Sequence, residues 1–421
     1  MPEFTLPYGK TKLTFSLPDM WQTTLIAPKE TPAASNPMEL VKQALDQPVG
    51  KHNLGDFVGA RSATIAISDK TRPVPHHHLL PPLLERLESM GLSPENITLL
   101  IATGTHPPML PDEYPSIIPP DILARYPVKC HNANDKKNLV YLGQTERGTP
   151  VWINRHFVQA DLRLVVGNME PHQFMGFSGG VKSAAIGLAG KEVINHNHAM
   201  MTDAKSKLGH FNHNPARQDV EEIGRIIGIH FALNVILNEN KQIVTAIAGE
   251  PRTVMEYGIP LVKKIYQFDV DAPFDVMIVS PGGHPKDINV YQSQKGLAHA
   301  ARVTKKAGTI ILAAACPEGS GSDKYEQWVS TKTSYQDVFD SFEREGFHVG
   351  AHKAFQIVRD ASNVRLLLLS DVPDDFVRQL LLTPVNSLEE ALAQTLDSLS
   401  SDARIGIMPL ANSTIPNIKK L

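Results

Sequence analysis

Cysteine is scarce in this sequence, which has only Cys130 and Cys316 among its 421 residues. Two cysteines are too few for the disulfide framework of a secreted domain, so we expect a reducing, cytoplasmic compartment. Long apolar runs are also absent. No stretch reaches the roughly 18 apolar residues of a membrane-spanning helix, and the N-terminus lacks the charged and then apolar pattern of a signal peptide. The sequence therefore predicts a soluble protein with no membrane partner.

A surplus of positive charge is absent as well. The formal net charge is -3 at pH 7, which offers no basic field for nucleic acid, so none is expected as a partner. Hydrophobic residues make up 42% and charged residues 20% of the chain, as in ordinary globular proteins. At about 150 residues per domain, the length favours two or three domains.

What the sequence does contain is an alternation of apolar runs and helical patterns. Residues 63–67, 97–102 and 162–166 are apolar runs typical of buried strands. Leucines between residues 79 and 87 recur at helical spacing, and Gly91 is a stop signal. Strand, helix and strand in that order indicate a βαβ unit and a mainly parallel sheet.

The same alternation starts again after Asp269-Val-Asp-Ala-Pro273. We therefore predict an α/β protein of two domains, each a mainly parallel sheet flanked by helices, with the active site in the cleft between them. The first domain is predicted at residues 1–268 and the second at 269–408. The C-terminal tail, residues 409–421, is expected to pack back on the first domain.

Each of the first three predicted strands runs into a polar loop with a candidate reactive residue. Asp69 and Arg72 follow the first strand, His106 follows the second, and His172 follows the third. In open α/β sheets, ligands bind beyond the carboxyl ends of the strands, so these loops are expected to share one rim. Because imidazole titrates near neutral pH, His106 and His172 are the natural acid/base pair.

The glycine-rich segment Gly176-Phe-Ser-Gly-Gly-Val-Lys-Ser183 is similar to a P-loop but does not match one, because Val181 separates Gly180 from Lys182. Glycines before a helix still expose backbone N–H groups that favour an anion. A small apolar run follows Lys182, and desolvation there would favour a neutral amine able to form a covalent bond. The alternative is an ordinary loop with a solvated lysine.

Two further clusters complete the candidate site. His196 and His198, taken with His172, allow an alternative function as a zinc-dependent hydrolase, although acidic ligands nearby are few. On a predicted helix over residues 289–296, Tyr291 and Lys295 share a face, with Gln292 beside Lys295. Together with Arg72 these side chains are suited to clamp a carboxylate. A solvated helix face and a non-catalytic anion-binding protein remain the other interpretations.

Five motifs that contain these residues are spread over the chain: Asp69-Lys-Thr-Arg-Pro73, Gly104-Thr-His106, Glu170-Pro-His-Gln-Phe-Met-Gly-Phe-Ser-Gly-Gly-Val-Lys182, Asn197-His198 and Tyr291-Gln-Ser-Gln-Lys295. In this order and at this spacing the sequence resembles the nickel-pincer lactate racemases and their relatives, which interconvert enantiomers or epimers of 2-hydroxy acids. The resemblance covers essentially the whole chain.

The resemblance implies a cofactor in the first domain, pyridinium-3,5-bisthiocarboxylic acid mononucleotide, that binds nickel as a pincer. The lysine matching Lys182 would join it through a thioamide, and the histidine matching His198 would be the protein ligand of nickel. Sulfur donors together with an imidazole suit nickel in a tetragonal site. The remaining nucleotide contacts would fall to the positions matching Asp69, Thr71, Gly179 and Gly180.

The resemblance also implies roles toward the substrate. His106 and His172 would be the acid/base pair, and Arg72, Tyr291, Gln292 and Lys295 would bind the substrate. One histidine would remove the hydroxyl proton while the Cα hydride moves to the cofactor, and a bound 2-keto acid would rotate before the hydride returns. The implied partners are a small 2-hydroxy acid, with lactate as the default, and the enzymes that make the cofactor and insert nickel.

Overall fold

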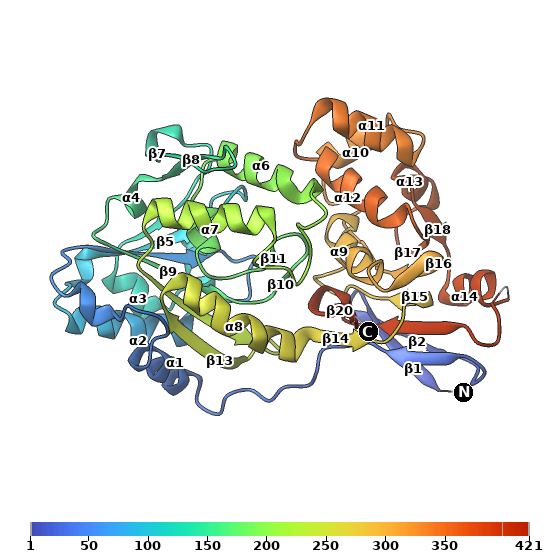
Figure 1. The fold of residues 1–421 in the computed structure, drawn as a ribbon, viewed down its shortest axis with the longest axis horizontal. Coiled ribbons are helices and arrows are strands. Elements are labelled where there is room, and N and C mark those ends of the chain that lie inside the picture. Colours follow the sequence, from blue (N-terminus) through green and yellow to red (C-terminus); the bar gives the residue numbers. More distant parts are fainter. Residues whose placement is uncertain (1, 398, 420–421) are drawn as a thin grey trace. The chain divides into compact units, whose positions relative to one another are not determined.

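The computed structural model describes residues 2–397 and 399–419 (Figure 1). Two compact units are present: a central unit of residues 30–265, and a terminal unit of residues 1–29 together with 266–421. In the described part of the chain, no helix combines the length and apolarity needed to cross a membrane.

The central unit is built on a six-stranded sheet that is parallel except at one edge. Its inner strands are buried on both faces, which explains their continuous apolar sequences. The predicted strands at 63–67, 97–102 and 162–166 are confirmed. In spatial order the strands are β13 (Ile243–Gly249), β12 (Phe231–Leu237), β9 (Leu162–Asn168), β4 (Ala63–Ser68), β5 (Ile97–Ala102) and β6 (Val128–Cys130).

Helices cover this sheet on both faces. The helices α1 (Pro37–Asp46) and α2 (His76–Ser89) pack with one face of the strands in a single apolar core. The helices α7 (Pro215–Ile227) and α8 (Pro251–Tyr266) run side by side, as Figure 1 shows, and Arg252 of α8 donates to Gln218 of α7 at 3.3 Å. Shorter elements complete the unit: α3 (Pro120–Arg125), α4 (Arg155–Val158), α5 (Lys182–Ala185), α6 (Lys191–Ala199), and the hairpins β7 (Leu139–Gln144) with β8 (Pro150–Asn154) and β10 (Pro171–His172) with β11 (Gly176–Phe177).

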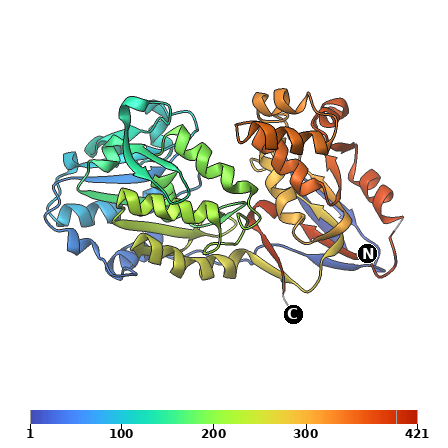
Figure 2. The same ribbon diagram turned by 45° about the horizontal axis from the view of Figure 1, so that its top comes forward.

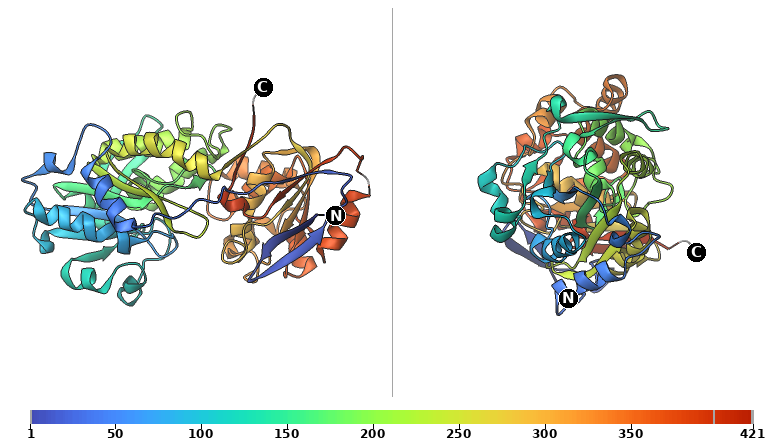
Figure 3. Two further views of the ribbon diagram at one scale, coloured as in Figure 1. Left: turned by 90° about the horizontal axis from the view of Figure 1, so that it is seen from below. Right: turned by 90° about the vertical axis from the view of Figure 1, so that its left-hand side faces the viewer.

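The terminal unit repeats the α/β pattern with a six-stranded, all-parallel sheet. Helices α9 to α13 gather on one face, and α14 with the hairpin β1–β2 packs on the other, as Figures 2 and 3 show. The strands in order are β18 (Thr383–Val385), β17 (Arg365–Leu369), β16 (Thr304–Ala313), β15 (Phe274–Val279), β19 (Arg404–Met408) and β3 (Gln22–Leu25). The other elements are β1 (Glu3–Tyr8), β2 (Thr11–Ser16), β14 (Gln267–Val270), β20 (Ile415–Ile418), α9 (Val290–Ala300), α10 (Asp323–Val329), α11 (Tyr335–Glu345), α12 (Ala351–Ala361), α13 (Asp374–Gln379) and α14 (Leu388–Leu396).

The terminal segments lie in a different unit from the one predicted for them. Residues 1–29 were expected in the first domain, but β3 pairs with β19 and belongs to the terminal unit. The tail was expected to pack on the first domain, but β20 pairs with β14 of the terminal unit. Both strands have four residues and no long apolar run. Their pairing depends on distant partners, which local sequence does not reveal.

Candidate active site

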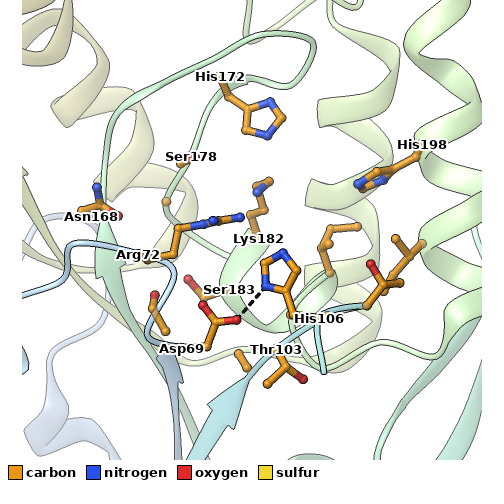
Figure 4. Close-up of a pocket in the computed structure, with 18 residues that line it drawn as sticks. Asp69, Arg72, Thr103, His106, Asn168, His172, Ser178, Lys182, Ser183 and His198 are labelled. Atoms are coloured by element: carbon orange, nitrogen blue, oxygen red, sulfur yellow. Dashed lines mark hydrogen bonds and ion pairs between the residues drawn. The ribbon is translucent and has the colours of Figure 1, made fainter. Parts of the chain in front are cut away.

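The polar loops that leave β4, β5 and β9 meet at one cavity of about 160 Å³ in the central unit (Figure 4). Its position beyond the carboxyl ends of parallel strands is the one that periodicity predicted. Lys182 lies between the loops that carry His106 and His172, with Arg72 and His198 on opposite sides of it. The predicted residues that line the cavity are Asp69, Arg72, His106, His172, Gly179, Lys182 and His198.

His106 is held by a buried carboxylate. Its Nδ1 lies 2.7 Å from Oδ2 of Asp69, whose side chain is only 4% exposed. The other carboxylate oxygen of Asp69 accepts from the backbone N–H of Thr71 at 3.1 Å and from its hydroxyl at 2.5 Å. Burial alone would raise the pKa of Asp69, but the hydrogen bonds from His106 and Thr71 outweigh it and lower that pKa. An ionised Asp69 accepts a hydrogen bond from the Nδ1–H of His106, so the lone pair of the neutral His106 ring lies on Nε2.

In His172 the proton lies on the other ring nitrogen than in His106. It sits in the two-residue strand β10, which pairs with β11 so that His172 is opposite Gly176. Its Nδ1 accepts a hydrogen bond from the backbone N–H of Met175 at 3.2 Å. An accepting Nδ1 carries no proton in the neutral ring, so Nε2 carries it. The two histidines of one cavity are therefore held in opposite neutral tautomers.

The glycine-rich turn before Lys182 requires glycine at defined positions. Gly176, Gly179 and Gly180 have φ angles of +76°, +98° and +58°, a region that disfavours other residues. A Cβ added to Gly176 would lie 1.7 Å from the carbonyl oxygen of His210. This turn leads directly into α5, which begins at Lys182.

A buried arginine that the sequence did not single out holds this turn. Arg217 of α7 is fully buried and donates to the carbonyl oxygens of Phe177 and Gly179, at 3.1 Å each, and to Glu221 at 2.6 Å. The amide of Gly180 donates to Asn234 of β12 at 2.8 Å. Thr71 and Gly180, both predicted to contact the cofactor, are not among the residues that line the cavity, although Thr71 donates to Asp69, which does line it.

His198 reaches the cavity from α6, whereas His196 does not line it. His196 instead pairs through Nδ1 with the hydroxyl of Thr149 at 2.8 Å. The ring of Phe174 lies between His172 and His198, with ring centroids 4.9 and 5.1 Å away. Among the described residues, no group of three or more His, Cys, Asp or Glu side chains is placed to hold a metal ion. The three-histidine zinc site of the alternative hypothesis is therefore not assembled.

The residues that line the cavity do fit a metal that is bound mainly by an organic cofactor. The imidazole of His198 and the amine of Lys182 line the same cavity, and a single histidine ligand suffices for a metal whose other donors come from a cofactor. The polar lining from Ser68, Asn168 and Ser178 is suited to a nucleotide.

The other predicted substrate residues lie on α9 of the terminal unit. Lys295 donates to the side chain of Gln292 at 2.8 Å, and the hydroxyl of Tyr291 lies 3.1 Å from Nε2 of His352. Burial raises the pKa of Tyr291. A lysine that sequence reasoning missed, Lys353 of α12, lies 4.1 Å from the ring of Tyr291 and is buried. The predicted helix at 289–296 corresponds to α9, in which Lys295 contacts Gln292 while Tyr291 contacts residues of α12.

Comparison with known proteins identifies the family. The Lactate racemase N-terminal domain family matches residues 8–209, and the Lactate racemase C-terminal domain family matches residues 270–415. A domain of unknown function, DUF362, matches residues 120–328. A lactate racemase from Thermoanaerobacterium thermosaccharolyticum is 31% identical over 99% of both chains. A lactate racemase from Lactiplantibacillus plantarum is 33% identical over 77% of both chains.

A comparison with solved structures leads to the same family. The lactate racemase apoprotein from T. thermosaccharolyticum superposes with a TM-score of 0.91 at 30% identity, over 99% of this chain and 100% of that one. A Thermotoga maritima protein shares the fold, with a TM-score of 0.68 at 20% identity, over 91% of this chain and 99% of that one. The predicted α/β fold and the resemblance are confirmed, and with them an enzyme of the isomerase class. The chain belongs to the lactate racemase family.

Proposed function

We propose that this protein is a racemase or epimerase of 2-hydroxy acids, with lactate as the first candidate substrate, and that it uses a nickel-pincer nucleotide tethered at Lys182. The observation that carries this proposal is the cavity in which His106 and His172 stand in opposite tautomers beside Lys182 and His198. Two relatives that cover most of this chain are lactate racemases, which supports lactate as the first substrate to test.

The cofactor would be held by residues of the central unit. The amine of Lys182 would form the thioamide, the imidazole of His198 would bind nickel, and the turn at Gly179 would approach the nucleotide. When bound, the cofactor would accept the hydride of the substrate's Cα and return it to either face of the resulting 2-keto acid. The described residues offer no comparable hydride acceptor, so this chemistry is assigned to the cofactor.

The histidines would move the hydroxyl proton. With its lone pair on Nε2, His106 is ready to take a proton. His172 would give a proton from its doubly protonated, cationic form, because a neutral imidazole that lost its only proton would become an anion. After one conversion the protonation states are exchanged, which is the state needed for the reverse conversion. A racemase requires such a pair because each enantiomer presents its hydroxyl from a different side.

The carboxylate of the substrate would be bound by cationic side chains. Arg72 lines the cavity and offers a bidentate fork. We include Tyr291, Gln292 and Lys295 of α9 in this role because of the motif that contains them and because Lys295 donates to Gln292. A firm hold on the carboxylate would keep the 2-keto acid bound while it turns.

The first test is chemical. Protein produced together with the cofactor-synthesis and nickel-insertion enzymes, which we propose as its partners in the cytoplasm, should contain nickel and show a mass increase on the peptide with Lys182. A Lys182→Arg variant is the matched control and should show neither covalent mass nor activity. Protein that carries zinc and an unmodified Lys182 would contradict the proposal.

The second test is functional. A polarimetric screen of D- and L-2-hydroxy acids with the loaded protein should identify the substrate. His106→Ala and His172→Ala should each abolish racemisation while the mass on Lys182 stays. Full activity in both variants would show that the acid/base assignment is wrong.

A further inference from the structure

Behind the cavity, α7 carries a carboxylate that the function above does not use. Asp219 is fully buried and accepts three hydrogen bonds: from the hydroxyl of Thr145 at 2.6 Å, from the hydroxyl of Thr149 at 2.9 Å, and from Nδ2 of Asn197 at 2.8 Å. Two of these donors come from the segment that joins β7 to β8, and the third comes from α6. A buried carboxylate with three donors is costly to assemble, which points to a purpose other than packing.

The first consequence is a fixed orientation for Asn197. Its Nδ2 donates to Asp219 at 2.8 Å and to the carbonyl oxygen of Ala216 at 2.9 Å. Both of these partners only accept, so the nitrogen of the amide must face them and both of its hydrogens are used. The amide oxygen is thereby turned toward Nδ1 of His198, at 3.3 Å.

The second consequence is the tautomer of His198. An amide oxygen only accepts hydrogen bonds, so Nδ1 of His198 carries the proton and the lone pair of the neutral ring lies on Nε2. This is the less common tautomer of a free neutral imidazole, in which the proton prefers Nε2. A neutral imidazole binds a metal through the nitrogen that carries the lone pair, and a partner on the other nitrogen sets which one that is.

The same carboxylate acts on His196 through a different residue. Thr149 has a single hydroxyl hydrogen, which it gives to Asp219, so its oxygen accepts from Nδ1 of His196 at 2.8 Å. His196 is thereby tied to the joining segment of β7 and β8 and does not line the cavity. The Asn-His-Asn-His motif thus contains one histidine turned to the cavity and one turned away from it.

We propose that Asp219 is a positioning residue for the metal: through Asn197 it fixes the tautomer and ring orientation of His198, so that Nε2 is the ligand atom. The assignment of nickel to His198 rests on the proposed function, but the tautomer does not. The carboxylate of Asp219 and the amide of Asn197 would support the imidazole that binds the metal. Loss of such a hydrogen-bond partner of a metal ligand typically costs about 10- to 100-fold in metal affinity.

The first experiment measures the tautomer in protein made without the cofactor pathway. Nitrogen-15 NMR of the imidazoles, at a pH where they are neutral, should show His198 with its proton on Nδ1, assigned by comparison with His198→Gln. In Asn197→Ala the signal should move to the Nε2-protonated form. Thr149→Val is the matched control, because it should change the signal of His196 and leave that of His198 unchanged. A wild-type His198 protonated on Nε2 would overturn the proposal, as would a His198 signal that Asn197→Ala leaves in place.

The second experiment measures metal retention in the loaded protein. The rate of nickel loss to EDTA should rise about 10- to 100-fold in Asn197→Ala and in Asp219→Asn, and should stay within about 3-fold in Thr149→Val. If the wild-type protein never acquires nickel, the proposed function fails while the NMR result still decides the tautomer. If the NMR result holds but the variants keep nickel as the wild type does, the positioning role is wrong and the proposed function stands.

Discussion

Replacing Asp69 with asparagine should convert His106 from a base into a group that cannot accept the substrate's proton. The backbone N–H and hydroxyl of Thr71 both donate to Oδ1 of Asp69, so an asparagine would keep its oxygen on that side. Its amide nitrogen would then face Nδ1 of His106, at the position where Oδ2 lies 2.7 Å away. An amide N–H donates, so Nδ1 would become the acceptor and the proton of the neutral ring would move to Nε2.

The size of the effect follows from what the tautomer does. A positioned general base contributes about 10²- to 10⁴-fold in rate, and a wrong tautomer removes most of it. Asp69→Asn should therefore lower kcat by about 10²- to 10⁴-fold, or about 3–5 kcal/mol in the activation barrier. Because two enantiomers have equal free energies, kcat/KM must fall by the same factor in both directions. Initial rates from each enantiomer, followed by polarimetry, provide the measurement.

The control removes the ion-pair partner of Lys70, the residue that follows Asp69 in the same loop. Lys70 forms an ion pair with Glu113, and neither residue contacts His106 in the pairs described, so Glu113→Gln removes a nearby carboxylate without touching the imidazole. Its kcat should stay within about 3-fold of the wild type, and both variants should carry the cofactor mass on Lys182. An Asp69→Asn enzyme with at least a third of the wild-type kcat would refute the tautomer argument.

Three further predictions concern stability. Arg217→Met should lower the free energy of unfolding by about 3 kcal/mol in denaturant titrations, because among the described residues it leaves buried Glu221 with Arg252, at 3.8 Å, as its remaining ion-pair partner. Gly176→Ala should lower the Tm and reduce the mass gained on Lys182, because its left-handed φ alone costs about 1–2 kcal/mol and its Cβ meets backbone. Burial lowers the pKa of His131 to about 4, so the unfolded chain binds more protons between about pH 6.5 and pH 4. The free energy of unfolding should fall as the pH drops through that window, and His131→Gln should flatten the decline.

The parts of the fold that could be predicted from the sequence are those with a strong local signal. The strands at residues 63–67, 97–102 and 162–166 are apolar throughout because both faces are covered, and each matches an observed strand. The shared rim of the loops after them follows from parallel topology alone. The pairing of Gln22–Leu25 with β19 could not be predicted in this way, because about 380 residues separate the partners and the strand itself is polar.

The predicted site was incomplete for a similar reason. Asp69 was expected to hold the cofactor, and the structure shows it bonded to His106, a contact between two loops that spacing does not reveal. The roles of Lys182 and His198 came from the family resemblance, since a lysine and a histidine separated by 16 residues match no common metal spacing. Geometry adds what the resemblance lacks, namely which nitrogen of each imidazole carries the proton.

The helix α7 contacts both the turn before Lys182 and the residue beside His198, although none of its residues lines the cavity. Arg217 on α7 holds the carbonyl oxygens of the turn before Lys182, and Asp219 holds the amide beside His198. Charged residues in an amphipathic helical pattern normally indicate a solvent-facing side, so the sequence pattern alone does not indicate that Arg217 and Asp219 of α7 are buried. Their burial means that a single rigid element fixes both the proposed tether and the proposed metal ligand. Movement of α7 would therefore displace Lys182 and His198 together, and mutations on it should affect cofactor attachment before they affect substrate binding.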